Sequence, residues 1–143
     1  MKVKQISVFL ENKSGRLLDV TRVLAGRGIN IRALSIAETA DYGVLRLIAD
    51  NPEKARSELE QAGFAVSETD VLAVEIADVP GGLVGALEPL NAAGINVEYL
   101  YSFVEKSGES AIVVFRVEDI DGAVRALQSA GFEILKGEDV YRL

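Results

Sequence analysis

The sequence contains no cysteine, no histidine and no tryptophan among its 143 residues. Without cysteine the chain has no disulfide, thiolate zinc site, iron–sulfur cluster or cysteine nucleophile. Without histidine it lacks the commonest general base and the commonest transition-metal ligand, and a Ser-His-Asp triad is excluded. Any catalysis would have to use carboxylates, lysine, tyrosine or arginine. The composition therefore favours a binding protein, and we expect no catalytic site, no metal site and no cofactor.

Positive charge is also scarce, because 15 Lys and Arg residues stand against 22 Asp and Glu residues, a net charge of −7. This balance disfavours nucleic acid and anionic membrane surfaces, since both are bound mostly by neutralising negative groups. No apolar run approaches the ~18–20 residues of a membrane span, and the first residues do not resemble a signal peptide. We therefore expect a cytoplasmic protein. The charge is uneven: residues 1–70 hold ten basic and ten acidic residues, and residues 71–143 hold five and twelve.

The chain repeats itself with an offset of 66 to 68 residues. The turn N-K-S-G-R-L at 12–17 corresponds to D-V-P-G-G-L at 78–83. The G-I-N at 28–30 recurs at 94–96, and the A-G-F at 62–64 recurs at 130–132. Because the matches keep the same order across nearly the whole chain, we predict two repeats, residues 1–69 and residues 70–143.

Each repeat has the pattern strand, helix, strand, strand, helix, strand. In the second repeat, Pro89 lies inside a predicted helix at 81–93, where proline kinks or weakens a helix. Segment 139–143 follows the second repeat and is a candidate for one more strand. Right-handed crossovers then give an antiparallel four-stranded sheet with both helices on one face. The predicted fold is a ferredoxin-like α+β sandwich, present twice.

Strand alternation predicts which side chains face the helices and which face away. The helix-facing set is Ile6, Val8, Leu10, Leu45, Leu47, Leu72, Val74, Ile76, Val113 and Phe115. The opposite face is expected to carry Phe9, Leu34, Ile36, Val44, Ile48, Leu100, Val104, Ile112 and Val114. This second set is too apolar for a face in contact with water, so we expect the two faces to be covered by each other or by another chain.

The turns carry a family resemblance. An Asn/Asp-x-x-Gly-x-Leu turn after the first strand, an amphipathic helix and a Gly-Ile-Asn before the second strand occur in both repeats. Together they resemble the ACT domain, and segments 11–17 and 96–103 are similar to small stand-alone tandem ACT proteins of bacteria. The resemblance covers essentially the whole chain. It implies a regulatory or sensor protein that holds a small metabolite, typically an amino acid, at an interface between paired domains. It also implies a homodimer or higher homo-oligomer, with a regulated enzyme as a candidate partner.

The chemistry of the turns fits an amino acid. Free backbone N–H groups at 15–17 and 81–83 begin helices, where local donors and the helix dipole favour a carboxylate. Asn12 or Asp78 can accept from an ammonium group, and Asp78 does so more strongly because it is charged. The resemblance adds an Asn before the second strand of each repeat. The candidate ligand-binding residues are Glu11, Asn12, Ser14, Gly15, Arg16, Leu17, Asn30, Arg46, Asp78, Pro80, Gly81, Gly82, Leu83 and Asn96.

Simpler roles compete with these assignments. Asn12 and Asp78 are also typical turn residues or helix caps. Arg46 has Val114 as its counterpart in the second repeat, and it suits an interface ion pair as well as a contact with a ligand carboxylate. Which of the two turns carries the site stays open.

Other functions compete as well. The apolar faces and the acidic second repeat are compatible with a ligand-free interaction module that docks on a metabolic enzyme. Single-stranded RNA binding shares the strand order, but the sequence lacks the basic face of that module. The aromatic residues Tyr99, Tyr101 and Phe103 share one face of a strand, and we expect them in the core rather than as a stacking platform.

Overall fold

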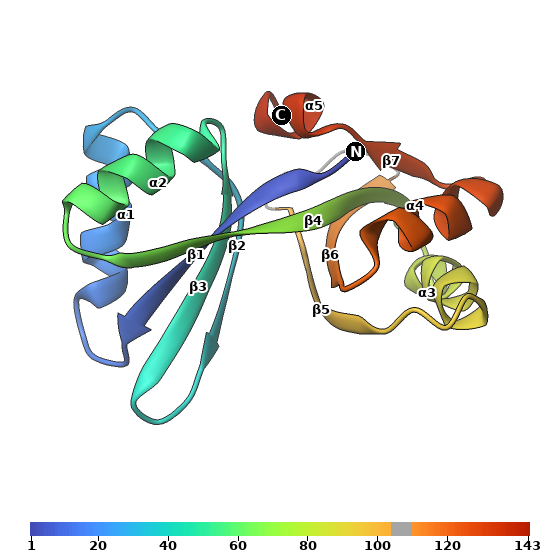
Figure 1. Ribbon diagram of the computed structural model, residues 1–143, viewed down its shortest axis with the longest axis horizontal. Helices are drawn as coiled ribbons and strands as arrows, with labels where there is room; N and C mark the ends of the chain where they lie inside the picture. The colour runs from blue at the N-terminus through green and yellow to red at the C-terminus, as the bar shows by residue number, and fades with distance from the viewer. Residues whose placement is uncertain (104–109) are drawn as a thin grey trace. The chain divides into compact units, whose positions relative to one another are not determined.

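The computed structural model describes residues 1–103 and 110–143 (Figure 1). The chain forms two compact units, each built around one repeat. The first unit comprises Lys4–Thr69 with Tyr141–Leu143, and the second comprises Asp70–Val140 with Met1–Val3. The last residues of the chain therefore belong to the unit of the first repeat, and the first residues belong to the unit of the second.

The first unit has the predicted order of elements. These are β1 (Val3–Glu11), α1 (Arg16–Gly26), β2 (Ile31–Glu38), β3 (Tyr42–Ala49), α2 (Pro52–Gln61) and the first part of β4 (Ala65–Ala77). The strand order is β2-β3-β1-β4, and β3 runs antiparallel to both β1 and β2. Both helices lie on one side of the strands (Figure 1).

The core of the first unit lies between these helices and the sheet. Its buried residues follow the helix period along α1 and α2 and the two-residue period along β1 and β3. They are Ile6, Val8, Leu10, Val20, Leu24, Ile29, Leu45, Leu47, Ala49, Ala55 and Leu59. The helix-facing side chains predicted for β1 and β3 are thus confirmed.

The second unit repeats the plan with the second part of β4 as its first strand. The other elements are α3 (Gly82–Ala92), β5 (Val97–Ser102), β6 (Ser110–Val117), α4 (Ile120–Ser129), β7 (Glu133–Leu135) and α5 (Gly137–Tyr141). The strand order is β5-β6-β4-β7, which matches β2-β3-β1-β4 of the first unit. Its core contains all five predicted helix-facing residues, Leu72, Val74, Ile76, Val113 and Phe115. The ferredoxin-like fold class is confirmed, and Pro89 lies inside α3.

Three apolar residues lie on the face opposite to the predicted one. Leu34 and Ile36 pair with Leu47 and Leu45, so they face the helices. The reason is a β-bulge between Ile31 and Ala33, which shifts the alternation by one residue.

The second repeat has the same irregularity. Its bulge lies between Val97 and Tyr99, and it places Leu100 beside Phe115 on the helix face. The extra residues of the two bulges, Arg32 and Glu98, are 66 positions apart and carry opposite charges. Tyr101 and Phe103 are buried, as predicted, whereas Tyr99 is only half-buried. Val104 lies outside the described residues.

The C-terminal segment is a helix rather than the predicted strand at 139–143. The short helix α5 opens with N–H bonds from Asp139 and Val140 to the Lys136 carbonyl, and it buries Val140 completely. At its last residue, the Tyr141 hydroxyl accepts a hydrogen bond from the Lys4 N–H (2.8 Å).

The strand β4 also differs from the prediction. The pattern predicts a last strand for the first repeat and a separate first strand for the second. The structure joins them into the one continuous strand β4, because no glycine or proline interrupts the chain between them.

Candidate functional site

The turn between β1 and α1, residues 11–17, is called turn 1. Gly15 caps α1 with a left-handed backbone (φ +90°), which glycine adopts without the steric cost of a Cβ. Among the residues that the structure describes, no side chain forms a cap hydrogen bond at the start of this helix. Within the described residues, the N–H groups of Leu17 and Leu18 find no backbone acceptor. Turn 1 therefore presents the donors that a carboxylate needs.

Asn12 ties turn 1 to the hairpin between β2 and β3. Its Nδ2 donates to the carbonyl oxygens of Thr39 and Ala40, each at 3.2 Å, and its backbone N–H donates to the Asp41 carbonyl at 2.9 Å. Asn12 is therefore a turn residue and not the helix cap. Because the Nδ2 group donates to the two hairpin carbonyls, only the side-chain oxygen of Asn12 is available to a ligand.

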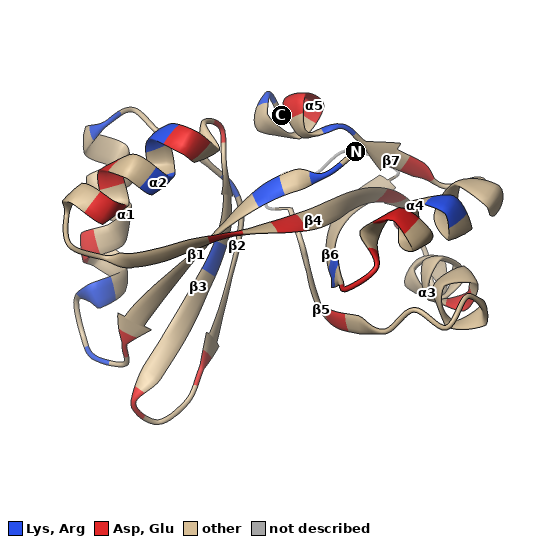
Figure 2. Ribbon diagram, in the orientation of Figure 1, with Lys and Arg blue, Asp and Glu red and all other residues tan. Residues whose placement is uncertain are grey.

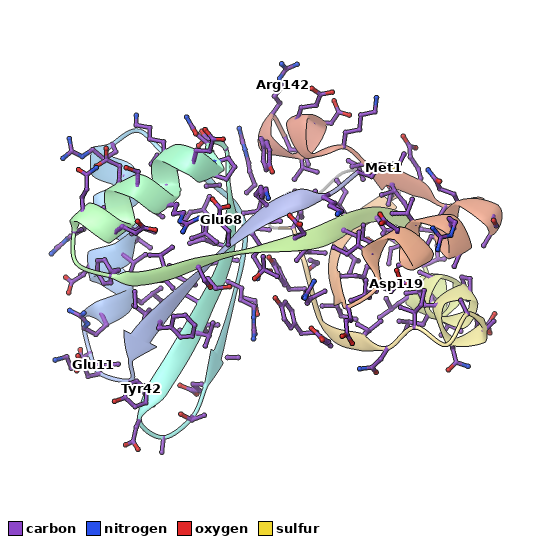
Figure 3. The ribbon with its side chains drawn as sticks, viewed as in Figure 1. Met1, Glu11, Tyr42, Glu68, Asp119 and Arg142 are labelled. Atoms are coloured by element: carbon purple, nitrogen blue, oxygen red, sulfur yellow. The ribbon has the colours of Figure 1, made fainter. Side chains whose placement is uncertain are left out.

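The charged residues of turn 1 form local pairs. Lys13 Nζ lies 3.1 Å from Glu11 Oε2, and Arg16 Nη1 lies 3.6 Å from Asp19 Oδ2. The Arg16 guanidinium is also 5.3 Å from the centre of the Phe64 ring, and its Nε is shielded and finds no hydrogen-bond partner in the described part of the chain. Exposed pairs of this kind contribute only about 0–1 kcal/mol, so a ligand anion can compete for either cation. Figure 3 shows Glu11 at this end of the sheet.

Away from the turn, the outer helices carry mixed charge (Figure 2). Arg27 pairs with Glu58 at 3.0 Å, and Arg56 pairs with Glu60 at 2.7 Å. The hydrogen bond to Glu60 raises the pKa of Arg56, which is charged at physiological pH in any case. We interpret these ion pairs as ordinary surface pairs of the helices and assign them no part in the site.

The turn between β4 and α3, residues 77–83, is called turn 2. Gly81 caps α3 with φ +83°, and again no side chain in the described ranges forms a cap hydrogen bond there. A Cβ on Gly82 would overlap the Ala77 carbonyl oxygen, so this position excludes any side chain. Asp78 is the one charged residue of the turn, and it is exposed. The two turns share their backbone plan and differ in charge.

The remaining turn residues have different surroundings. Ser14 and Pro80 are exposed, Leu17 is 40% exposed, and Leu83 packs partly buried against the core of the second unit.

Asn30 and Asn96 lie at the other end of their sheets. Asn30 precedes β2, and its N–H donates to Asp50 Oδ1 at 3.0 Å, whereas turn 1 adjoins the far end of that strand. Asn96 lines a cavity of about 250 Å³ with Glu98, Glu118 and Asp119 among its neighbours. Within a repeat, therefore, the structure does not bring these residues to the turn.

Arg46 is also away from turn 1. It lies in the middle of β3, opposite Ser7 and Ser35, on the face that points away from the helices.

One cavity was not indicated by the sequence. A space of about 350 Å³ in the first unit is lined by Lys4, Asp50, Asn51, Pro52, Glu53, Glu68 and Tyr141. It was missed because Tyr141 comes from the end of the chain, and no repeat pattern indicates that this residue joins the first unit.

Two general findings concern residues 1–103 and 110–143. No helix in these ranges is long and apolar enough to cross a membrane. No group of three or more acidic side chains is placed to hold a metal ion.

Comparison with known proteins agrees with the fold described above. A family profile described as an ACT domain pair matches residues 1–143. The chain is similar to protein BT0572 from Bacteroides thetaiotaomicron, with 44% identity, a TM-score of 0.94, and coverage of 100% of this chain and 98% of that one. It shares its fold with the ligand-free regulatory subunit of aspartate kinase from Thermus thermophilus, at 20% identity, a TM-score of 0.67, and 90% and 92% coverage. The Thermus flavus regulatory subunit is similar at 19% identity, a TM-score of 0.62, and 89% and 91% coverage. A search of curated proteins gave no match.

Proposed function

This chain belongs to the ACT domain pair family, and on that basis we propose that it is a regulatory protein that binds an amino acid or a similar small metabolite. The ligand lies beside turn 1 or turn 2, at an interface between ACT domains, in a homodimer or higher homo-oligomer. The protein works in the cytoplasm and performs no catalytic step. It regulates either through its own assembly or through a metabolic enzyme that it contacts.

The observation that carries this proposal is the pair of uncapped helix starts. Both α1 and α3 begin after a left-handed glycine, and within residues 1–103 and 110–143 no side chain forms a cap hydrogen bond with their first N–H groups. Such groups bind a carboxylate through local hydrogen bonds and through the helix dipole, and the glycine allows close approach. A ligand ammonium needs an acceptor nearby, which the Asn12 oxygen provides at turn 1 and the Asp78 carboxylate at turn 2.

The candidate residues divide into two groups under this proposal. The turn residues contact the ligand from the repeat whose helix begins at that turn. They are Glu11, Asn12, Ser14, Gly15, Arg16 and Leu17 at turn 1, and Asp78, Pro80, Gly81, Gly82 and Leu83 at turn 2. The others, Asn30, Arg46 and Asn96, would reach the ligand from a different domain across an interface. In either case the ligand can shift the assembly only by its differential affinity for two arrangements.

A thermal-shift panel of the twenty amino acids tests ligand binding. At a hundred times the dissociation constant a ligand adds about 2.7 kcal/mol of stability, which raises Tm by several degrees for a chain of this size. We expect one amino acid, or a small group of related ones, to produce this shift. No shift from any of them at millimolar concentration would count against the proposal.

Calorimetric titration of variants then locates the site. Replacing Asp78 by alanine removes the acceptor of turn 2, and replacing Asn12 by alanine removes that of turn 1. We expect one of the two to weaken binding at least tenfold. The matched control is Asp139→Ala in α5, an exposed acid that belongs to neither turn, which should bind as the unchanged protein does.

The alternative function is a ligand-free module that docks on a metabolic enzyme. Exposed apolar side chains favour it, among them Phe9 (52% exposed), Tyr42 (63%) and Val79 (59%). The same titrations distinguish the two functions, because a docking module would bind no amino acid in any variant.

A further inference from the structure

The cavity beside Tyr141, called the Tyr141 cavity, is built from four separate parts of the first unit. Lys4 comes from the start of β1, residues 50–53 lead into α2, Glu68 comes from β4, and Tyr141 ends α5. Its volume of about 350 Å³ lies within the roughly 300–1,000 Å³ that small-molecule sites usually occupy. These residues belong neither to turn 1 nor to turn 2, so the cavity is separate from both turns.

The end of the chain holds one wall of this cavity in place. The Tyr141 hydroxyl accepts a hydrogen bond from the Lys4 N–H at 2.8 Å, and the Tyr141 carbonyl accepts one from Arg32 Nε at 3.2 Å. Because the two bonds hold the side-chain end and the backbone end of the same residue, the ring between them has a defined position. Together with the ring of Pro52, it gives the cavity an apolar part of its wall.

The polar part of the wall is mostly negative. Asp50, Glu53 and Glu68 bring three negative charges to the lining. Lys4 brings one positive charge, so these four residues have a formal charge of −2. Glu68 Oε2 already lies 3.6 Å from Arg56 Nη1, whereas Asp50 and Glu53 form no ion pair in the described part of the chain. Two carboxylates of the cavity are therefore available to a positively charged ligand.

The hydrogen bonds around the cavity restrict the kind of ligand that fits it. The start of α2 is already capped, because Asn51 Oδ1 accepts from the Lys54 N–H at 3.2 Å, so it does not call for an anion. Asp50 Oδ1 accepts from the Asn30 N–H at 3.0 Å, which leaves its second oxygen for a ligand. Among the described residues no three acidic side chains are placed to hold a metal ion. The cation that fits is therefore an extended one, with its positive charges apart and an apolar stem between them.

We propose that the Tyr141 cavity binds an aliphatic diamine, a molecule with two ammonium groups joined by a short hydrocarbon stem. One ammonium group donates to Asp50 and Glu53, and the other donates to Glu68. The stem lies against the rings of Tyr141 and Pro52, where an aromatic face also attracts a cation. The charge of +2 on the diamine balances the formal charge of −2 on the lining, and charge-assisted hydrogen bonds hold both ends. This site goes beyond the function proposed above and does not depend on it.

Equilibrium dialysis with putrescine, a diamine with a four-carbon stem, tests the class of ligand. We expect one putrescine to bind per chain. Butylamine keeps the stem and loses one ammonium group, so it should bind about tenfold more weakly. Magnesium chloride at the putrescine concentration should not displace the diamine, because a compact ion cannot reach carboxylates that lie apart. Equal binding of the two amines, displacement by magnesium, or no putrescine binding at millimolar concentration would each overturn the proposal.

Conservative variants then test the location. Asp50→Asn keeps the acceptor for the Asn30 N–H, and Glu53→Gln keeps the size of its side chain, so both should fold with an unchanged Tm. Each removes one charge from the cavity and should weaken putrescine binding by about five- to tenfold. The matched control is Glu38→Gln, an exposed acid of the same unit that comes from the end of β2, and it should bind as before. Equal weakening in all three variants would contradict the site. A protein that binds an amino acid but no diamine lacks only this site, and the proposed function stands.

Discussion

Replacing Gly82 by alanine should destabilise the protein through one steric contact. Gly82 begins α3 with a backbone that any residue can adopt, so the substitution brings no φ penalty. The new Cβ, however, would overlap the Ala77 carbonyl oxygen at the end of β4, and backbone cannot rotate away as a side chain can. Overpacking of this kind costs about 1–3 kcal/mol. Because a change of 1 kcal/mol shifts Tm by roughly 3–4 °C at this chain length, we expect Tm to fall by roughly 3–12 °C.

The matched control lies three residues further along the same helix. A Cβ on Gly85 would meet the Phe132 ring at 3.6 Å, an ordinary van der Waals contact, and alanine favours a helix over glycine by about 0.5–1 kcal/mol. Gly85→Ala should therefore raise Tm by a few degrees. Both variants are measured by calorimetry, with urea unfolding as a second probe. Shifts of the same sign would refute the geometry of turn 2 described above.

Three further outcomes follow from the packing and hydrogen bonds. Leu59→Ala and its counterpart Leu127→Ala each empty a fully buried site and should lower the free energy of unfolding by about 2–5 kcal/mol in urea titrations. Asn12→Asp replaces the donor to two carbonyl oxygens by a carboxylate and should cost about 1–2 kcal/mol in thermal melts, whereas Asp78→Asn should change stability by less than about 0.5 kcal/mol. Ending the chain at Val140 removes the hydrogen bonds of Tyr141, so amide exchange should quicken at the starts of β1 and β2, while removal of Leu143 alone should have no such effect.

The repeat and the core could be predicted from the sequence because burial restricts residue type. Ile6, Val8 and Leu10 alternate along β1, and their register partners on β3 are apolar at the matching positions. A one-residue shift would have exposed this whole set, so the pattern itself determined the face. The same reasoning identified the core of the second repeat.

The predictions of strand faces were wrong where the two-residue alternation of a strand is interrupted. The bulges at Arg32 and Glu98 each add one residue to an edge strand, and the residue types at these positions do not predict a bulge. Counting alternate residues from the start of β2 or β5 therefore placed Leu34, Ile36 and Leu100 on the wrong face. The C-terminal helix was missed for a different reason. Its single buried anchor, Val140, gives no period that distinguishes a five-residue helix from a short strand.

The candidate site was predictable only in its backbone. The glycines at 15 and 81 and the helix starts that follow them can be recognised from the repeated turn, because left-handed backbone selects glycine. The hairpin carbonyls that hold Asn12 come from residues 39 and 40, which are distant in sequence and bear no recognisable signal. The stacking of Arg16 near Phe64 is likewise a product of the fold.

The two turns differ in charge, and water or a ligand can reach them. Core pairs such as Leu59 and Leu127 are identical, because both are fully buried and any polar substitute would lose its hydrogen bonds. The turn pairs differ in charge: Asn12 corresponds to Asp78, and Arg16 corresponds to Gly82, where no side chain fits. At turn 1 a zwitterionic amino acid therefore meets the neutral oxygen of Asn12 and the nearby Arg16 cation. At turn 2 it meets the Asp78 carboxylate and no cation. Two such unequal places cannot have equal affinity for the same amino acid, so calorimetric titration should give one strong site per chain rather than two equivalent ones.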